Sequence, residues 1–535
     1  MKKICFISVR NEDYKFERLL NSIRNLKVPD DCSISFLEAS SEDGIASAYE
    51  EARQLSKAEI NIYIDGNAEI IKDDFLYSLL DIYETDSEIA IVGVLGAGYI
   101  PTSGFANESS KIYGSYKNED GRTKQGCDID KKIIPVMCVE GFFMAIKGKI
   151  SWRKDLFHGK AFYDTAQCME YMRAGLKSVV IKEDEPWIKF ERVGVEASYE
   201  EQQIFLDEYS KDIYPLVSVV IPTFQRPEYF ELALKSVLAQ TYRNLDIYIT
   251  DNSHDNITAK LMEKYLKEDN RIKYEFYPED SKEQNIARYY TYDNKNAEYV
   301  NYMMDDDLFA PEKIAKMMDF YLKDESIALV TSYRQLIDAE GNKIPDEKFS
   351  RPIAEETTLF DGKSAGRGIL INYCNYIGEP TTPLIKKKYL NGRYKGWSGE
   401  EGRYNISDYP LWLRILQYGN MVYIREPLSY FRIHEGQSLN RRDITVFNAV
   451  TMAYEIQYAI HHNVYLTEEK DIRLAYLMWI SLTSRILREL ETIENELSAR
   501  EKEDKGKIED ILCNMSLYIN GKGTTAFDVD VSSEL

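Results

Sequence analysis

The strongest constraint on the fold is an alternation of strand-like and helix-like segments that occurs twice along the chain. In the first stretch, buried-strand patterns such as Ile4–Val9 and Ile60–Asp65 alternate with segments of helical periodicity. A charged helical stretch at residues 197–212 follows, and the alternation starts again at Val217–Ile221. Strands separated by helices form parallel sheets with crossover helices on their faces. The sequence therefore predicts an α/β fold with two tandem, Rossmann-like domains, each built on a mostly parallel sheet.

Chain length and the C-terminal pattern complete the predicted domain organisation. With 535 residues the chain is too long for a single hydrophobic core. From about Thr445 the pattern changes to long amphipathic helices, which are also candidates for a homo-oligomer interface. We predict a first α/β domain at 1–195, a linker at 196–213, a second α/β domain at 214–444 and a helical C-terminal region at 445–535.

Charge, cysteine content and hydropathy argue against several functional classes. The chain has 89 acidic and 67 basic residues, and its net charge of −22 disfavours broad contact with nucleic acid or anionic lipid. Seven dispersed cysteines without a CxxC pair argue for a reducing compartment and against a zinc or disulfide framework. The N-terminus lacks a signal-peptide core, and the longest apolar run, Ile89–Ile100, is too short to span a bilayer. We therefore predict a cytoplasmic protein without a nucleic-acid partner, and peripheral membrane attachment stays open.

Three adjacent carboxylates, Asp305 to Asp307, follow the strand-like run that begins at Tyr299. Adjacent carboxylates repel one another, and a divalent cation among them relieves that repulsion. Hard cations such as Mg or Mn prefer oxygen ligands. The alternative is a solvated turn in which an Asp caps the following segment.

Other polar residues follow the neighbouring strands of the second domain. Ligands bind beyond the carboxyl ends of the strands in such sheets, so these residues are expected at one rim. The segment PTFQRPEY follows the first strand, Asp251 follows the second, and Arg288 lies just before the third. One arginine among several carboxylates suits a ligand that combines hydroxyls with phosphates bridged by a metal.

The motifs VSVVIPTFQRPEYF, LDIYITDNSHD, NIARYY and YMMDDDLFAPEKI resemble family 2 of the inverting glycosyltransferases, whose nucleotide-sugar-binding fold is called GT-A. The resemblance runs from about Val217 to His434. It implies that the second domain binds a nucleotide-diphosphate sugar, with a UDP-sugar favoured, and a divalent metal. The implied nucleotide-sugar residues are Pro222, Phe224 and Arg226 in the nucleotide pocket, Asp251 on the base, Arg288 on the base or phosphate, and Asp305 on the ribose.

The same resemblance implies Asp306 as the metal ligand, although the family pattern is broken beside it. Relatives usually have Asp-any-Asp-Asp, and the first of these positions is Met304 here. The number of protein–metal bonds is therefore left open. In the segment YFRIHEGQSLN, His434 matches a position that in relatives often lies near the metal or diphosphate. A purely structural histidine is the alternative at this position.

The segment NISDYPLWLRILQYG resembles the family's stretch in which an acidic residue precedes an aromatic-rich LWLR helix. By this resemblance Asp408 is the general base. An inverting transfer needs one carboxylate to take the proton of the acceptor hydroxyl as its oxygen attacks the anomeric carbon. Asp408 ahead of Pro410 is also typical of a helix N-cap, and the two roles are compatible.

The first domain resembles a second GT-A family, termed glycosyltransferase-like. The segments IYIDGNAEIIKDDFLYSLL, VEGFFMAIKG and FYDTAQCMEYMRAGLKSVVI carry this resemblance. Its metal-site position reads Asp65-Gly66-Asn67, where relatives usually carry a stronger acidic or His-containing triplet. Asp164 corresponds in position to Asp408 and is equally suited to an N-cap. We expect either a differently tuned transferase or a degenerate domain that binds acceptor or partner.

These observations predict a metal-dependent inverting glycosyltransferase whose acceptor hydroxyl belongs to a saccharide, a lipid-linked glycan or a protein. One alternative is a bifunctional enzyme in which each domain adds a sugar. Another is a non-catalytic glycan-binding scaffold, suggested by Met304 and the weak first-domain triplet. A nucleotidyltransferase normally has a glycine-rich phosphate loop after the first strand, and PTFQRPEY contains no glycine.

Overall fold

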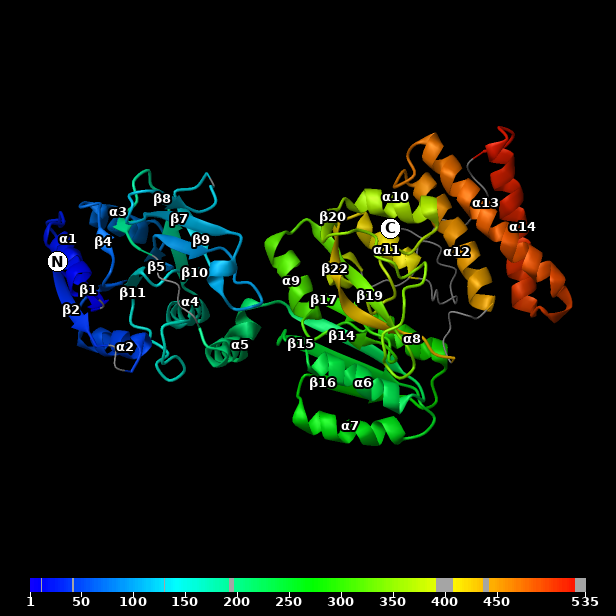
Figure 1. Cartoon of the computed structure of the whole chain (residues 1–535), viewed down its shortest axis with the longest axis horizontal. Coiled ribbons are helices and arrows are strands. Elements are labelled where there is room, and N and C mark those ends of the chain that lie inside the picture. Colours follow the sequence, from blue (N-terminus) through cyan, green and yellow to red (C-terminus); the bar gives the residue numbers. More distant parts are fainter. Residues whose placement is uncertain are drawn as a thin grey trace. The chain divides into compact units, whose positions relative to one another are not determined.

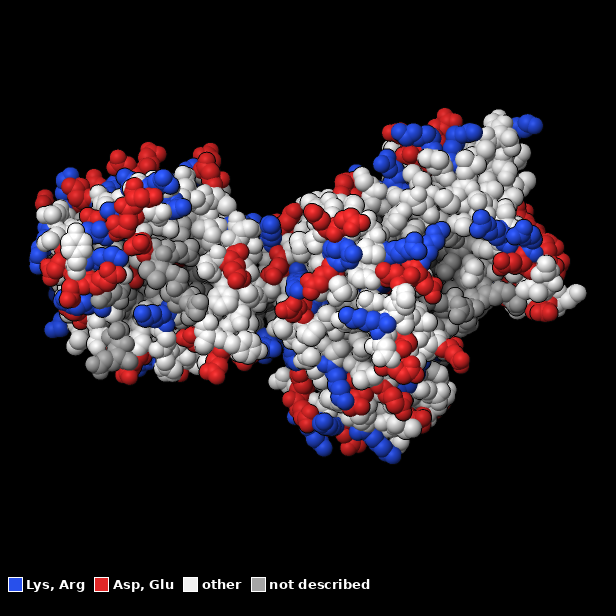
Figure 2. Space-filling view, in the orientation of Figure 1, with Lys and Arg blue, Asp and Glu red and all other residues white. Residues whose placement is uncertain are grey.

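The computed structural model of the chain describes residues 1–10, 12–40, 43–128, 130–191, 197–390, 408–435 and 442–524. The chain divides into two compact units, Met1–Tyr214 and Pro215–Leu535 (Figure 1). Within the ranges given, no helix is long and apolar enough to cross a membrane. Figure 2 shows acidic and basic side chains interspersed over the visible face of each unit, so the net charge of −22 is not gathered in one patch there.

Unit 1 alternates strands and helices around a central sheet. Its elements are β1 (Lys2–Val9), α1 (Asp13–Arg24), β2 (Cys32–Ala39), α2 (Ile45–Leu55), β3 (Ile60–Ile64), β4 (Glu69–Ile70), α3 (Phe75–Thr85), β5 (Ile89–Gly93), β6 (Leu95–Ala97), β7 (Ile112–Lys117), β8 (Thr123–Gln125), β9 (Ile133–Val136), β10 (Cys138–Val139), β11 (Phe143–Lys147), α4 (Tyr163–Arg173), β12 (Lys177–Ile181), β13 (Ile188–Lys189) and α5 (Tyr199–Ile213). The main sheet has the order β2-β1-β3-β11-β5-β12-β9, and a second sheet has the order β10-β6-β7-β13-β4.

The core of unit 1 follows from its hydrophobic patterning. Every residue of β3, sequence INIYI, is buried, as expected for a strand covered on both faces. Helix α1 buries Phe16, Leu19 and Ile23, whose helical spacing places them on one stripe. Strand β1 lies between β2 and β3 and is parallel to both, so the expected parallel crossover pattern is present at this edge.

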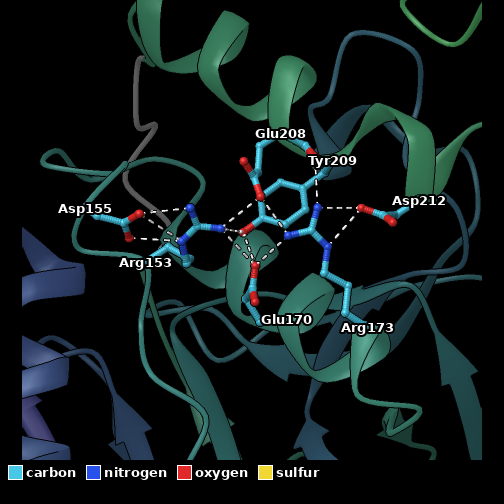
Figure 3. A network of polar contacts seen from close by, with 7 residues as sticks. All are labelled: Arg153, Asp155, Glu170, Arg173, Glu208, Tyr209 and Asp212. Carbon is cyan, nitrogen blue, oxygen red and sulfur yellow. Dashed lines mark hydrogen bonds and ion pairs between the residues drawn. The ribbon is translucent and has the colours of Figure 1, made fainter.

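Helix α5 lies inside the segment predicted as a linker and packs on unit 1. A capping box between Ser198 and Glu201 begins the helix, and Phe205 and Tyr209 are fully buried. Figure 3 shows two arginines, Arg153 and Arg173, in a network of polar contacts with α4 and α5. Their acidic partners are Asp155, Glu170, Glu208 and Asp212.

Unit 2 repeats the α/β plan and adds long helices. Its elements are β14 (Leu216–Thr223), α6 (Pro227–Leu238), β15 (Leu245–Asp251), α7 (Ile257–Glu268), β16 (Ile272–Phe276), α8 (Lys282–Thr291), β17 (Ala297–Tyr302), β18 (Leu308–Phe309), α9 (Lys313–Lys323), β19 (Ile327–Ile337), β20 (Thr358–Phe360), α10 (Gly362–Asn372), β21 (Leu384–Lys386), α11 (Tyr409–Leu416), β22 (Asn420–Arg432), α12 (Arg442–His461), α13 (Glu469–Thr492) and α14 (Ala499–Ile519).

The sheet of unit 2 has the order β16-β15-β14-β17-β21-β19-β22-β18, with β20 paired to β22. Three strands predicted from sequence, β14, β15 and β17, form a parallel block together with β16, which was not predicted. The short strand β21 is antiparallel to both β17 and β19. Unit 1 places β11 in the corresponding antiparallel position between β3 and β5. Each sheet is therefore mixed, and β9 in unit 1 and β18 and β20 in unit 2 also pair antiparallel with their neighbours.

The C-terminal helices share one core with the sheet of unit 2. Trp412 of α11 and Leu370 of α10 belong to the same buried cluster as Ile456 of α12, Trp479 of α13 and Met515 of α14. Figure 1 shows α12, α13 and α14 beside α10 and α11. Burial of these apolar faces inside unit 2 accounts for the amphipathic pattern that begins at about Thr445.

Candidate functional site

Strand pairing brings the first loop of unit 2 to the three aspartates. Strand β14 is parallel to β17, with Val220 opposite Tyr302, so both strands end at the same edge of the sheet. The Thr223 hydroxyl donates to Oδ2 of Asp305 at 3.0 Å, and the Phe224 amide points to the same oxygen at 3.4 Å. Pro222 is buried within β14 opposite Thr250 and is therefore not an exposed lining residue of a nucleotide pocket.

The carboxylate of Asp306 contacts two side chains, an arginine and a histidine. Arg226, at the start of α6, donates from Nη1 to Oδ2 of Asp306 at 2.8 Å, and the same nitrogen lies 3.5 Å from Asp305. Nε2 of His434 lies 3.0 Å from Oδ2 of Asp306. The pairing of β18 with β22, Leu308 opposite Tyr430, brings the chain leading to His434 back to this turn.

Asp307 is a buried acceptor and differs from the simple turn cap expected at an exposed position. Its Oδ2 accepts a hydrogen bond from Thr381 at 2.6 Å, and its Oδ1 accepts the backbone N–H of Arg432 at 3.1 Å. The Arg432 side chain is buried and donates to the carbonyl of Asp306 at 2.7 Å. The guanidinium of Arg432 also lies over the ring of Tyr229, which packs against His434.

Burial and mutual repulsion change the proton affinity of this turn. Burial, reinforced by the Asp306 carboxylate, raises the pKa of Asp305 from 3.8 to about 7, against the opposing effect of Arg226. The same two causes raise the pKa of Asp307 well above its usual range. Asp306 keeps some solvent exposure, 13% of its side chain, at the rim. The turn therefore holds two buried carboxyls of raised pKa on either side of Asp306.

Asp251 and Arg288 follow and precede strands at this edge of the sheet but differ in burial: Asp251 is buried, whereas Arg288 is partly exposed. Asp251 has no exposed surface, and its oxygens accept the Ser253 amide at 2.8 Å and the Tyr274 hydroxyl at 2.7 Å. A contact between this carboxylate and a base therefore requires the following loop to move. Arg288 is 40% exposed, forms an ion pair with Asp280 at 2.7 Å and lies over the ring of Tyr277.

Phe224 is the exposed aromatic side chain of the first loop. It is 38% exposed and meets the ring of His254 edge-on at 5.3 Å between centroids. Its neighbour Gln225 has a φ of 51°, in the left-handed region, and donates its backbone N–H to Ser253 at 2.8 Å. The loops after β14 and β15 are therefore tied together, with an aromatic face between them that suits stacking of a base.

Asp408 occupies the N-cap position of α11 but does not use its side chain as a cap. Its backbone carbonyl accepts the N–H of Trp412 at 3.1 Å, and no hydrogen bond joins its carboxylate to the first turn. Burial raises the pKa of Asp408 well above its usual range; the Glu379 carboxylate adds to this rise and Arg334 opposes it. A carboxyl with raised proton affinity, unused by capping, is chemically suited to accept a proton.

The first-domain candidates are engaged by their own backbone. Oδ1 of Asp65 accepts the N–H of Asn67 at 2.7 Å. Asp164 accepts the amides of Gly141 and Thr165 at 2.8 and 2.7 Å, and burial raises its pKa despite these bonds. The carboxylates of Asp65 and Asp164 thus accept backbone N–H groups, whereas that of Asp306 contacts the side chains of Arg226 and His434.

Several residues of the unit 2 site received no role from the sequence. Thr223, Tyr229 and Arg432 lie inside the quoted motifs, whereas Arg334, Glu379 and Thr381 lie outside them. Arg432 lies two residues before His434 in the strand motif YFRIH, and period-two alternation places both on the same side of β22 and its extension. The others come from segments whose approach to the aspartates depends on tertiary pairing.

The chain offers two metal-ligating side chains at one point. Within the described residues, no group of three or more His, Cys, Asp or Glu is arranged to hold a metal ion. Asp306 and His434 nevertheless present an oxygen and a nitrogen 3.0 Å apart. Mg and Mn sites at nucleotides commonly take one or two protein ligands and complete their shell with phosphate oxygens and water. These two residues fit such a site.

Comparison with known families agrees with this fold and site. The model of the "Glycosyltransferase like family" matches residues 5–209, and that of "Glycosyl transferase family 2" matches residues 218–375. The protein is therefore of the glycosyltransferase class, with two GT-A-like domains in tandem and a helical C-terminal region. Its second domain is similar to glycosyl transferase family 2 over residues 218–375.

Individual relatives are distant and are matched over part of their length. An uncharacterized glycosyltransferase of Rickettsia typhi is 28% identical over 42% of this chain and 66% of that protein. The GalNAc(5)-diNAcBac-PP-undecaprenol beta-1,3-glucosyltransferase of Campylobacter jejuni is 24% identical over 48% of this chain and 78% of that protein. The match covers 66%, 35% and 49% of the length of three curated relatives.

Solved structures show only a loose likeness to the whole chain. S. aureus TarS 1–349 in complex with UDP-GlcNAc is 17% identical and covers 59% of this chain and 95% of its own, with a TM-score of 0.38. A similarity of that size carries no argument about ligands.

Proposed function

We propose that unit 2 transfers a sugar from a nucleotide-diphosphate donor to an acceptor hydroxyl with inversion, assisted by a divalent metal. The observation that carries the proposal is the convergence of Arg226 and His434 on Asp306, the carboxylate that stays accessible between two buried acids. A diphosphate with its metal ion needs this combination of cationic and metal-ligating groups. Catalysis is assigned to residues 214–444.

In the proposed reaction Asp408 takes the proton of the acceptor hydroxyl. Arg226 lies where it can neutralise the donor diphosphate, and Phe224 offers its exposed ring to the base. Asp306 and His434 would hold Mn or Mg, which when bound stabilises the negative charge of the departing nucleoside diphosphate. Asp305, held by Thr223, is proposed to face the ribose. Arg288 at the rim is proposed to contact the base or a phosphate.

The donor and acceptor are proposed at the level of class. A UDP-sugar is favoured by the likeness of Asp251 and Arg288 to the base-binding positions of the family. The acceptor is proposed to be a saccharide, a lipid-linked glycan or a protein; one relative's name specifies an undecaprenol-diphosphate-linked glycan. Seven free cysteines support a reducing, cytoplasmic location. Peripheral membrane association and a homo-oligomer through α12 to α14 remain part of the proposal.

The direct test is binding and turnover with a nucleotide-sugar panel. We expect Mn together with one UDP-sugar to raise the melting temperature of the protein, and Asp306→Ala to abolish that rise. The matched control is Asp255→Ala, an exposed aspartate of the same unit. If no nucleotide sugar is transferred or hydrolysed and Asp306→Ala leaves UDP binding unchanged, the proposal is wrong.

A further inference from the structure

A buried ion pair joins β19 to the segment that precedes β21. Nε of Arg334, on β19, lies 2.7 Å from Oε2 of Glu379, and only 7% and 17% of the two side chains is exposed. Neither atom has a directed hydrogen bond, so the contact is mainly one of charge with charge. A second guanidinium nitrogen of Arg334 donates to the carbonyl of Phe349 at 2.8 Å, which fixes the arginine in place.

The segment that carries Glu379 is tied to the turn of aspartates. Thr381, two residues after Glu379, donates to Asp307 at 2.6 Å. Gly378 has a φ of +104°, and a Cβ there would come within 2.8 Å of Thr382 and 3.2 Å of Arg334. A left-handed glycine therefore lets the segment turn closely over the arginine.

The same segment is also tied to the helix that begins at Asp408. The fully buried Trp412 donates its indole N–H to the carbonyl of Gly378 at 3.1 Å. Its backbone N–H bonds the Asp408 carbonyl at 3.1 Å. Trp412 thus joins the first turn of α11 to the residue preceding Glu379. In the described part of the chain, Glu379 and Arg334 are the charged side chains that act on Asp408.

We propose that Glu379 and Arg334 are positioning residues for Asp408. Their ion pair holds the first turn of α11 in place and sets the electrostatic surroundings of the base. This inference rests on the proposed function, because it assumes that Asp408 accepts the acceptor's proton. Glu379 favours the protonated form of Asp408 and so makes it a stronger base, while Arg334 prevents two unpaired carboxylates from facing each other.

The raised pKa of Asp408 supports this arrangement. Burial is its largest cause, and Glu379 is the next, with Arg334 opposing. Replacement of Glu379 by an uncharged residue of the same shape leaves Arg334 to act alone. The pKa of Asp408 then falls, and a base of lower pKa removes protons less effectively.

The kinetic test compares Glu379→Gln, Glu379→Asp and a control. In Glu379→Gln we expect the acid limb of the kcat/KM profile to move about one pH unit lower, kcat to fall about tenfold and KM for the donor to stay unchanged. Glu379→Asp retains the charge and should keep the limb near its wild-type position. The control is Glu426→Gln, which removes an exposed glutamate paired with Lys316 at 2.8 Å and should change neither value. An unmoved limb in Glu379→Gln, or an equal shift in Glu379→Asp, would overturn the inference.

A stability cycle tests the pair without any assumption about turnover. Because the folded pKa of Asp408 is raised, its ionisation costs folding free energy as pH rises, so Asp408→Asn should raise the melting temperature at pH 8 by a few °C. In the Glu379→Gln background this gain should be smaller. Equal gains in melting temperature in both backgrounds would refute the coupling between Glu379 and Asp408, even if the protein transfers no sugar. Unequal gains without any turnover would refute only the proposed function.

Discussion

The raised pKa of Asp305 predicts how the free energy of unfolding depends on pH. Asp305 is buried beside Asp306, and its pKa rises from 3.8 to about 7. Between these two values the folded chain keeps a proton that the unfolded chain releases, so the free energy of unfolding falls as pH rises. We therefore expect Asp305→Asn to stabilise the metal-free protein at pH 8 and to give no stabilisation at pH 4.

The size of the effect follows from the structure. A rise in pKa from 3.8 to about 7 corresponds to ~4 kcal/mol at a pH above both values. The amide oxygen can still accept from Thr223 and Phe224, because both donors point to the same carboxylate oxygen. The new NH₂ group would face Arg226, 3.5 Å from the other oxygen, which costs about 1 kcal/mol. The expected net gain is about 3 kcal/mol.

Urea unfolding of wild type and Asp305→Asn at pH 4.5, 6, 7 and 8, with chelator present, measures this difference. The control Asp255→Asn changes an exposed aspartate that accepts the N–H of Ile257 at 2.9 Å, and its effect should not vary over this range. The reasoning is refuted if the difference between wild type and Asp305→Asn is constant with pH. A destabilisation that grows with pH would refute it as well.

Two further predictions concern buried and networked charges. Burial lowers the pKa of Lys313, whose Nζ donates to the Thr382 carbonyl at 2.6 Å, so the free energy of unfolding should rise between neutral pH and the ordinary lysine pKa. Lys313→Met should flatten that rise and be about 1 kcal/mol more stable than wild type at pH 7, as measured by denaturant unfolding. Arg173→Ala removes ion pairs to Glu208 and Asp212 (Figure 3) and should lower the free energy of unfolding by about 1 kcal/mol. Arg122→Ala, at an exposed arginine, is the control and should leave that free energy almost unchanged. Equal unfolding midpoints for these two variants would contradict a stabilising network.

The sequence predicted the α/β class and the parallel part of each sheet because these depend on local periodicity. Largely apolar runs such as INIYI and VSVVI are buried strands, and helical spacing in α1 and α9 matches their buried faces. A common edge for Arg226 and Asp306 was anticipated, since parallel strands end at one edge, whereas a position of His434 near the metal was implied only by the family resemblance. The common principle is that short-range pattern and strand order together determine which residues follow a strand.

Long-range pairing accounts for what the sequence did not predict. Strand β21 is three residues long, and nothing in LIK indicates that it runs antiparallel between β17 and β19. Its position brings Glu379 and Thr381 to the aspartates. Likewise, the amphipathic pattern after Thr445 predicts helices, but their contact with Trp412 and Leu370 depends on which face meets the sheet's helices. Neither periodicity nor a motif contains that information.

The three adjacent aspartates show how surroundings divide identical side chains into different roles. Asp305 is held by donors from β14 and Asp307 by donors from Thr381 and β22, so both are withdrawn from solvent and favour their protonated forms. Full ionisation of all three would place like charges side by side, which burial makes more costly. Asp306 lies at the rim of the turn with Arg226 and His434 as neighbours. Asp306 is therefore the member of the turn whose carboxylate faces both a guanidinium and an imidazole, and these surroundings are the ones on which the proposed diphosphate and metal site rests.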